Sequence, residues 1–310
     1  MKRIFLWIGT LALAAAPAFA VPLGTSARAV VPADIQQIIS VDYRALKNSP
    51  TALALKARVL PDQLKEFETS LRAVGIDPDN DVEQLTFASF RANKRVQIIG
   101  LAQGTFTTKK ILARMRAHKI KGTKYRSNRI YSMSGGQDMT FLDDFTMLFG
   151  QRAAIETALD ARDGEAPGLN TNAAVTDNIA AVDSAPVWSV LDAQGTRNML
   201  HSTLGDAAKL ADYDMVKKRL LGSRYTMEFQ NGVNFNLSVV TSDSMTAATL
   251  SSLIQAGVLF RKMQAKGVEK TALDSVTVDS DSSNLTLNFK SDEQRFRTLV
   301  KSDLFASVIR

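Results

Sequence analysis

Histidine, cysteine and serine carry much of the nucleophilic and metal chemistry of proteins, and here histidine is rare, cysteine is absent and the serines lie outside catalytic motifs. The 310-residue sequence has no cysteine, which excludes disulfides, thiolate metal sites and thiol nucleophiles. Its two histidines, His118 and His201, fall in segments that we expect to be helical, and neither has a His, Asp or Glu three or four residues further on. Metal ligands on one helix face need that spacing. We therefore interpret both histidines as surface or structural residues and predict no metal and no other cofactor.

Motifs for covalent catalysis and phosphate binding are also missing. The sequence contains no G-x-S-x-G elbow, no S-x-x-K pair and no glycine-rich phosphate loop. Asp143 and Asp144 could be a carboxylate pair, but neighbours on one strand point to opposite faces, so a loop or bulge is the better interpretation. We expect no enzymatic activity. A hydrolase whose triad is assembled from distant residues remains an alternative.

Three alternating aspartates, Asp77, Asp79 and Asp81, resemble the start of a calcium-binding loop. Such a loop needs glycine at its sixth position and glutamate at its twelfth. Here these positions hold Val82 and Ala88. We therefore predict a connection between a helix and a strand rather than a calcium site.

A basic segment is the one feature that calls for a partner. No acidic residue stands between Glu83 and Asp138, although the net charge of the whole chain is only +7. The segment holds twelve cations: Arg91, Lys94, Arg95, Lys109, Lys110, Arg114, Arg116, Lys119, Lys121, Lys124, Arg126 and Arg129. Two interpretations stay open: a face that binds anions, or a solvated face balanced by the acidic remainder of the chain.

The candidate anion-binding residues within this segment are Arg95, Lys109, Lys110, Arg114, Arg116, Lys124, Arg126 and Arg129. Only Tyr125 and Tyr131 offer rings for base stacking among them, so we expect no nucleic acid as a partner. The expected partners are an envelope protein or an anionic surface such as lipid head groups.

The first twenty residues have the three parts of a secretory signal peptide. Two basic residues, an apolar run over 4–16 and the triplet Ala18-Phe19-Ala20 follow one another, so we expect cleavage after Ala20. The run is too short for a membrane-spanning helix, which needs about 20 residues. Without a cysteine for lipid attachment or a second long apolar stretch, the mature chain is expected to be soluble, with no transmembrane segment, and periplasmic or secreted.

The remaining sequence alternates between strand and helix patterns. We expect strands at 35–43, 85–90, 96–102, 125–133 and 139–149, and helices at 52–60, 63–74, 107–118 and 151–161. A second set follows: strands at 187–191, 225–229, 233–240, 276–278 and 285–289, and helices at 196–204, 213–221, 245–265 and from 291 onward. Asn231-Gly232 between two alternating runs indicates a hairpin.

The two sets share one order of elements, which predicts an internal duplication. The fold class is α+β, with two similar halves of antiparallel hairpins covered by helices on one face. The expected boundaries are 1–20 for the signal peptide, 21–33 for a flexible mature N-terminus, 34–161 for the first half, 162–185 for a linker with a short helix, and 186–310 for the second half.

Short motifs give the sequence a resemblance to a loosely defined group of exported bacterial proteins of unknown function with duplicated α+β halves. They are Gly75-Ile76-Asp77-Pro78 with Asp81, and Phe141-Leu142-Asp143-Asp144 running to Leu148-Phe149-Gly150 before a helix that ends Ala158-Leu159-Asp160. The resemblance covers most of the mature chain and implies no activity and no catalytic residues.

Together these observations predict an exported, soluble, non-enzymatic binding or scaffold protein of the bacterial envelope. The first alternative is an anion-binding protein that uses the basic segment at an envelope surface, and the second is the hydrolase described above.

Overall fold

The computed structural model describes residues 22–204, 211–230 and 232–302. The expected signal peptide and Asn231 lie outside the described residues, so the signal peptide stays a prediction. No helix within the described ranges has both the length and the apolar character needed to cross a membrane.

The elements of the first half are α1 (Thr25–Ala29), β1 (Ile35–Asp42), α2 (Tyr43–Leu46), α3 (Pro50–Val59), α4 (Asp62–Ala73), α5 (Pro78–Asp81), β2 (Val82–Ala92), β3 (Arg95–Gly104), α6 (Thr108–Ala117), β4 (Gly122–Tyr125), β5 (Asn128–Ser132), β6 (Asp138–Phe141), β7 (Thr146–Gly150) and α7 (Arg152–Arg162). Those that follow are α8 (Ala173–Ala180), β8 (Val187–Asp192), α9 (Ala193–Leu204), α10 (Ala211–Val216), β9 (Leu220–Glu228), β10 (Val233–Thr241), α11 (Ser244–Gln264), α12 (Gly267–Asp274), β11 (Val276–Asp281), β12 (Asn284–Ser291) and α13 (Glu293–Leu299).

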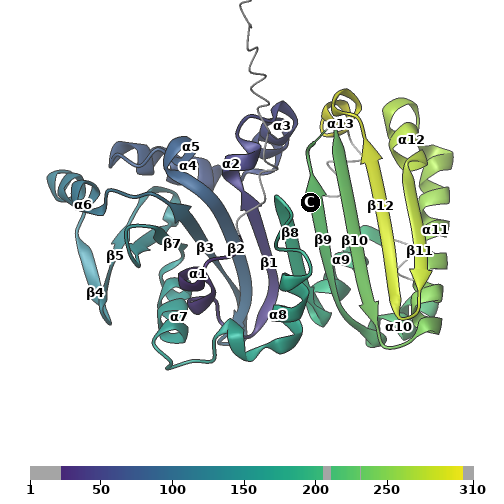
Figure 1. Cartoon of the computed structure of the whole chain (residues 1–310), viewed down its shortest axis with the longest axis horizontal. Coiled ribbons are helices and arrows are strands. Elements are labelled where there is room, and N and C mark those ends of the chain that lie inside the picture. Colours follow the sequence, from purple (N-terminus) through teal and green to yellow (C-terminus); the bar gives the residue numbers. More distant parts are fainter. Residues whose placement is uncertain (1–21, 205–210, 231, 303–310) are drawn as a thin grey trace, which may run out of the picture.

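One antiparallel sheet runs through the whole described chain, with twelve strands in the order β11-β12-β10-β9-β8-β1-β2-β3-β7-β6-β5-β4 (Figure 1). The two halves meet where β1 pairs with β8, and Ile39 lies opposite Ser189. Read outward from this pair, β1-β2-β3-β7-β6 and β8-β9-β10-β12-β11 have the same arrangement. The predicted α+β class with two similar halves is confirmed, and the halves share a single sheet.

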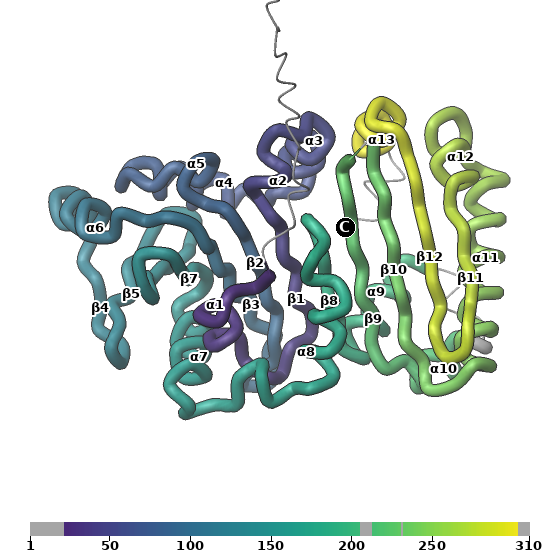
Figure 2. The backbone as a smooth tube through the Cα atoms, viewed as in Figure 1, coloured from purple at the N-terminus to yellow at the C-terminus, as the bar shows by residue number. Residues whose placement is uncertain are grey.

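Helices cover the two faces of this sheet unequally. On the face that we call face A, α4 and α6 pack over the first half, while α9, α10 and α11 pack over the second. On the opposite face B, α1, α7 and α8 pack over the first half (Figures 1 and 2). The helical cover predicted for one face is therefore present on face A throughout, and the first half has a second cover on face B.

Face B of the second half carries polar side chains instead of a helical layer. Asn178 of α8 accepts a hydrogen bond of 2.7 Å from Arg224 of β9, and beyond this contact no described helix covers β10, β12 or β11 on this side. Figure 1 shows these strands with nothing in front of them. Asn236 and Asn288 lie opposite each other there and share a hydrogen bond of 2.6 Å.

The mature N-terminus was expected to be flexible, and for residues 22–33 this is wrong. The segment contains α1 and buries Ala27, Val30 and Val31 in the core on face B. Arg28 adds an ion pair with Asp183 at 3.2 Å. Burial of these small apolar side chains outweighs the weak helical pattern that the sequence shows.

The segment 162–185 was expected to be a linker with a short helix. The helix is present as α8, but the segment packs into the core of the first half instead of acting as a linker. Its helix α8 buries Val175 and Ile179 in the same core as α1 and α7. Its Gly168 also forms a strand-like bridge with Pro32.

The strand expected at 125–133 corresponds to β5, and β4 precedes it as the other strand of a hairpin, while the strand expected at 139–149 is divided by a turn into β6 and β7. Arg126 adopts a φ of 49° in the turn between β4 and β5. Asp143 accepts a hydrogen bond of 2.8 Å from the Phe145 amide between β6 and β7, which confirms that Asp143 and Asp144 lie in a turn rather than on one strand.

Candidate functional site

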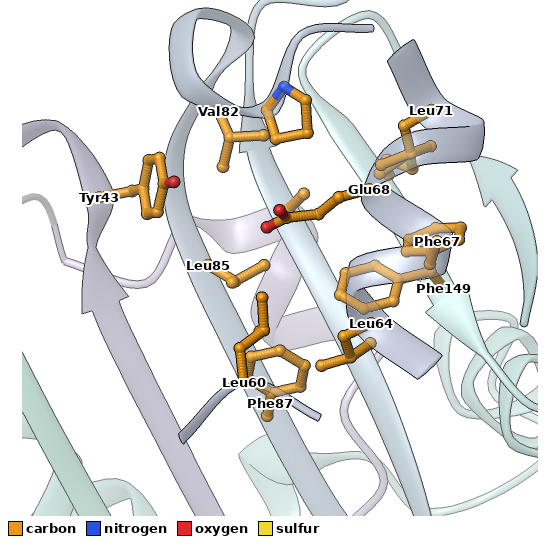
Figure 3. Close-up of a pocket in the computed structure, with 13 residues that line it drawn as sticks. Tyr43, Leu60, Leu64, Phe67, Glu68, Leu71, Val82, Leu85, Phe87 and Phe149 are labelled. Atoms are coloured by element: carbon orange, nitrogen blue, oxygen red, sulfur yellow. The ribbon is translucent and has the colours of Figure 1, made fainter. Parts of the chain in front are cut away.

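An apolar cavity lies on face A of the first half, between α4 and the sheet (Figure 3). The space not filled by atoms measures about 470 Å³, part of which is open to solvent. Its lining comprises Tyr43, Leu60, Leu64, Phe67, Glu68, Leu71, Pro78, Val82, Leu85, Phe87, Ala102, Met147 and Phe149. A concave, mostly apolar space with a few polar groups at its margin is typical of small-molecule sites.

The periodicity of the surrounding elements aims these side chains into the cavity. On α4, Leu64, Phe67 and Leu71 are spaced by three and four residues and so share one face of the helix. On β2, Leu85 and Phe87 are two residues apart and point to the same face of the sheet. The cavity is therefore the place where a helical stripe and a strand stripe face each other without filling the space between them.

Phe149 of β7 forms one wall and is held by two other rings. It stacks on Phe67 with ring centroids 5.0 Å apart and meets Phe87 edge-on at 5.7 Å. Its ring lies directly over Gly100 of β3, where an added Cβ would stand 2.2 Å from Cζ of Phe149. Glycine is therefore required at position 100 if the ring is to lie against the sheet.

Charged and hydroxyl groups close one side of the cavity in a connected network. Lys56 of α3 donates a hydrogen bond of 2.6 Å to Oη of Tyr43 and forms an ion pair of 3.0 Å with Glu68. Tyr43 in turn donates to Asp79 at 2.7 Å. Figure 3 shows the Glu68 carboxylate extending from α4 toward Tyr43. We call this network the rim, and it joins α2, α3, α4 and α5.

Arg72 completes the network by pairing with both Asp77 and Asp79. Asp77 also caps α5 by accepting from the Asp79 amide at 3.3 Å. The three aspartates that resemble a calcium loop thus connect a helix to a strand, as predicted. No group of three potential metal ligands occurs anywhere in the described ranges.

Two groups of this network, the Tyr43 hydroxyl and the Lys56 ammonium, have pKa values above their usual values. Burial raises the pKa of the Tyr43 hydroxyl above its usual value, and the hydrogen bond from Lys56 does not cancel this effect. Burial acts to lower the pKa of Lys56, but its hydrogen bonds with Tyr43 and Glu68 outweigh it, so the pKa is raised. Lys56 therefore stays charged and Tyr43 stays protonated within the network at neutral pH.

Two exposed apolar side chains extend the cavity along face A. Val96 and Ile98 of β3 precede Gly100 at two-residue intervals, so their side chains lie on the same face of the sheet as position 100. Their exposed fractions are 52% and 58%. Ile98 neighbours Ser89 of β2, one alternation beyond Phe87. The apolar surface thus continues from the cavity toward solvent.

The predicted anion-binding residues are distributed over three places. Lys109, Lys110, Arg114 and Arg116 lie on α6, and Lys124, Arg126 and Arg129 lie on or between β4 and β5. Arg95 lies at the opposite end of β3, beside the β2–β3 turn. The eight side chains therefore do not converge on one site.

Acidic residues neutralise part of the basic segment. Arg126 pairs with Asp160 at 2.5 Å and with Glu165 at 3.4 Å. Arg91 pairs with Asp34 at 2.8 Å and Asp192 at 2.9 Å. These two cations of the segment are structural, in agreement with the interpretation of a balanced face.

Both histidines are exposed at helix ends. His118 ends α6, and His201 lies in the last turn of α9 with its ring 6.5 Å from that of Tyr213. Neither belongs to a metal cluster among the described residues.

The apolar cavity was not anticipated from the sequence. The stripe Leu64, Phe67 and Leu71 was recognised, but only as a buried helix face. The sequence offered two signals for it. They are a charged residue, Glu68, next to the apolar stripe, and Gly100 near Ile98 in the strand that became β3.

Comparison with known proteins supports the fold alone. No family model matches the chain, and no curated protein matches it. Among solved structures, crystal form I of TP0453 aligns with a TM-score of 0.52 at 10% identity, over 94% of this chain and 98% of that one. Crystal form III of TP0453 aligns with the same TM-score and identity, over 90% of this chain and 97% of the other.

Proposed function

We propose that this chain is an exported, non-enzymatic binding protein that holds a small apolar molecule, such as one with a hydrocarbon chain, in the cavity on face A. The observation that carries the proposal is a hollow lined almost entirely by apolar side chains, with a few polar groups at its margin. This composition is typical of small-molecule sites. Export rests on the charged, apolar and small-residue parts of residues 1–20.

The shape of the apolar surface favours an elongated ligand. The cavity continues onto exposed Ile98 and Val96, and a contiguous apolar surface is a feature of ligand-binding grooves. A ligand lying along Phe87 toward Ile98 would cover side chains that otherwise remain in water.

The rim supports binding rather than catalysis. Each of its charges already has a partner, since Lys56 pairs with Glu68 and Arg72 pairs with Asp77 and Asp79. A ligand therefore meets a polar margin without an unpaired charge. This favours a neutral or weakly polar molecule over an ionic one.

The test fills the cavity and measures the binding of a fluorescent apolar probe, N-phenyl-1-naphthylamine, to protein purified after export. Leu64→Trp places a larger side chain in the cavity, and we expect its probe affinity to fall about tenfold, equivalent to about 1.4 kcal/mol. The matched control is Leu273→Trp on α12, a half-buried leucine outside the cavity.

The control variant should bind the probe as the unmodified protein does. Equal affinity of all three proteins, or no measurable probe binding, would contradict the proposal. Circular dichroism on each variant shows whether the fold is retained.

A further inference from the structure

A second hollow lies at the end of the sheet, between α6 and the hairpin of β4 and β5, which lie side by side in Figure 2. The space not filled by atoms in this hollow measures about 1,110 Å³, and part of it is open to solvent. Leu112, Ile120 and Tyr131 provide apolar surface at its base. We call this hollow the α6–β4 groove.

Four cations surround the groove: Arg116, Lys119, Lys121 and Arg129. All four are exposed, and no acidic side chain lines the groove. Among the described residues, none of the four has an ion pair. Arg126, in the turn of the same hairpin, instead reaches Asp160 of α7 on the other side of the sheet. Acidic residues therefore neutralise the hairpin on face B and leave the groove on face A positive.

The backbone at Lys119 is unfavourable for a lysine. The end of α6 is closed by hydrogen bonds from the Ile120 amide to the Met115 carbonyl at 2.9 Å and from the Lys119 amide to the Arg116 carbonyl at 3.0 Å. This arrangement places Lys119 in the left-handed region with a φ of 60°. Glycine is the residue usually found at that position, because it has no Cβ to strain the backbone.

The hairpin also holds like charges together. Lys124 of β4 lies directly opposite Arg129 of β5, and both point to the side of the sheet that carries the groove. Like charges at directly opposed positions destabilise a strand pair. A helix C-terminus attracts cations, which accounts for Arg116 and Lys119 but not for Lys121 and Arg129 on the hairpin.

We propose that the α6–β4 groove binds a multiply charged phosphate group. Two guanidinium and two ammonium groups around one hollow can each donate hydrogen bonds to phosphate oxygens, and a bound anion would offset the repulsion among them. The groove is separate from the apolar cavity, so this site stands or falls independently of the proposed function. The phosphate can belong to a soluble anion or to a lipid head group, and both present the same oxygens.

The test measures binding of inorganic pyrophosphate by titration calorimetry and binding to vesicles of phosphatidic acid and phosphatidylcholine by co-sedimentation. The double variant Lys121→Gln with Arg129→Gln removes two groove cations. Its matched control, Lys94→Gln with Arg95→Gln, removes two cations at the β2–β3 turn. We expect the groove variant to lose about tenfold in affinity and the control to lose less than about twofold.

Lys119→Gly separates a binding role from a structural one. Relief of the left-handed strain should raise the melting temperature by about 2 °C. If the lysine serves binding, the same variant should bind the anion about threefold more weakly. A higher melting temperature with unchanged affinity would overturn the role assigned to Lys119.

The two ligand arms identify the source of the phosphate. Groove-dependent binding of pyrophosphate indicates a soluble anion, and groove-dependent binding of vesicles alone indicates a lipid head group. Either result supports the site. Absence of binding in both arms, or an equal loss in the groove and control variants, would overturn it.

Discussion

The two halves of the sheet have the same strand order but different surroundings. In the first half, β2 and β3 lie between helical layers on both faces, whereas β9 and β10 have one on face A and polar side chains on face B. The residue types at corresponding places account for this difference. Phe90 and Leu101 project from face B of the first half, and Asn236 and Ser238 project from face B of the second. Strand order therefore does not determine how many layers a sheet acquires.

Both candidate sites are built from segments in which the first half differs from the second. The cavity needs α3, α4 and α5, which lie between β1 and β2, while the described residues between β8 and β9 form α9, α10 and a short turn. The groove needs the β4–β5 hairpin, which the second half does not have in its described residues. The shared framework thus supports the sites, and the unshared segments form them.

Side-chain truncations on face B should give the largest difference in unfolding free energy between the two halves. Phe90→Ala removes a fully buried ring between two layers and should cost about 3–5 kcal/mol of unfolding free energy. Asn236→Ala on the open face should cost less than about 1 kcal/mol, because its side chain is exposed and loses one hydrogen bond. Urea unfolding curves give both values. A comparable loss in the two variants would mean that face B of the second half is covered by something beyond the described chain.

Glycine-to-alanine substitutions should change the unfolding free energy in opposite directions in the two halves. Gly100→Ala in β3 forces the Phe149 ring away from the sheet and should destabilise the protein by about 1–3 kcal/mol. Gly257→Ala in α11 meets no atom within 4 Å and should stabilise it by about 0.5–1 kcal/mol through better helix propensity. Thermal unfolding of both variants checks the signs. Stabilisation by Gly100→Ala would show that the aromatic wall of the cavity is loose.

The smallest expected difference is in the pH dependence of stability contributed by the N-termini of α6 and α11. Asp243 caps α11, and hydrogen bonds from the Thr246 amide, then Ser242 and the Thr246 hydroxyl, hold the pKa of its carboxyl well below the usual range. Because the folded-state pKa is lowered, the cap contributes stability above about pH 4, and this contribution is lost as the pH falls further. Thr107, which precedes α6, makes no side-chain cap bond and does not titrate.

Asp243→Asn preserves a good cap without the charge. We therefore expect the melting temperature of the unmodified protein to fall by about 1–2 °C more than that of the variant between pH 5 and pH 3. Thr107→Ser should leave the pH profile unchanged. Identical profiles for Asp243→Asn and the unmodified protein would show that the cap makes no contribution.

Local sequence patterns predicted most elements of the fold. The spacing of Leu64, Phe67 and Leu71 located α4, and the alternation around Asn231-Gly232 located β9 and β10. The failures involve tertiary packing. Residues 22–33 have a weak local pattern and are ordered by burial against α7 and α8. Pairing of β1 with β8 joins residues about 150 positions apart, and no local pattern reports it.

The candidate sites were less accessible to sequence reasoning than the fold. Residues that line an apolar cavity have the same type and spacing as residues that fill a core, so the stripe on α4 predicted burial and not a hollow. The basic segment was visible as composition, but only Arg116 and Arg129 of the eight candidates line the groove. Their companions Lys119 and Lys121 are distinguished by backbone conformation and by the absence of acidic neighbours, which become evident only in three dimensions.

The central pairing of β1 with β8 also imposes an order on folding. Strands β1, β2, β3 and β7 can associate as soon as residue 150 is available, but β1 then presents an unpaired edge until β8 arrives. That edge carries Ile35 and Ile38, which are fully buried in the finished fold. An exposed apolar strand edge can pair with other chains. Until β8 pairs with it, this edge of β1 is therefore open to the addition of a strand from another chain.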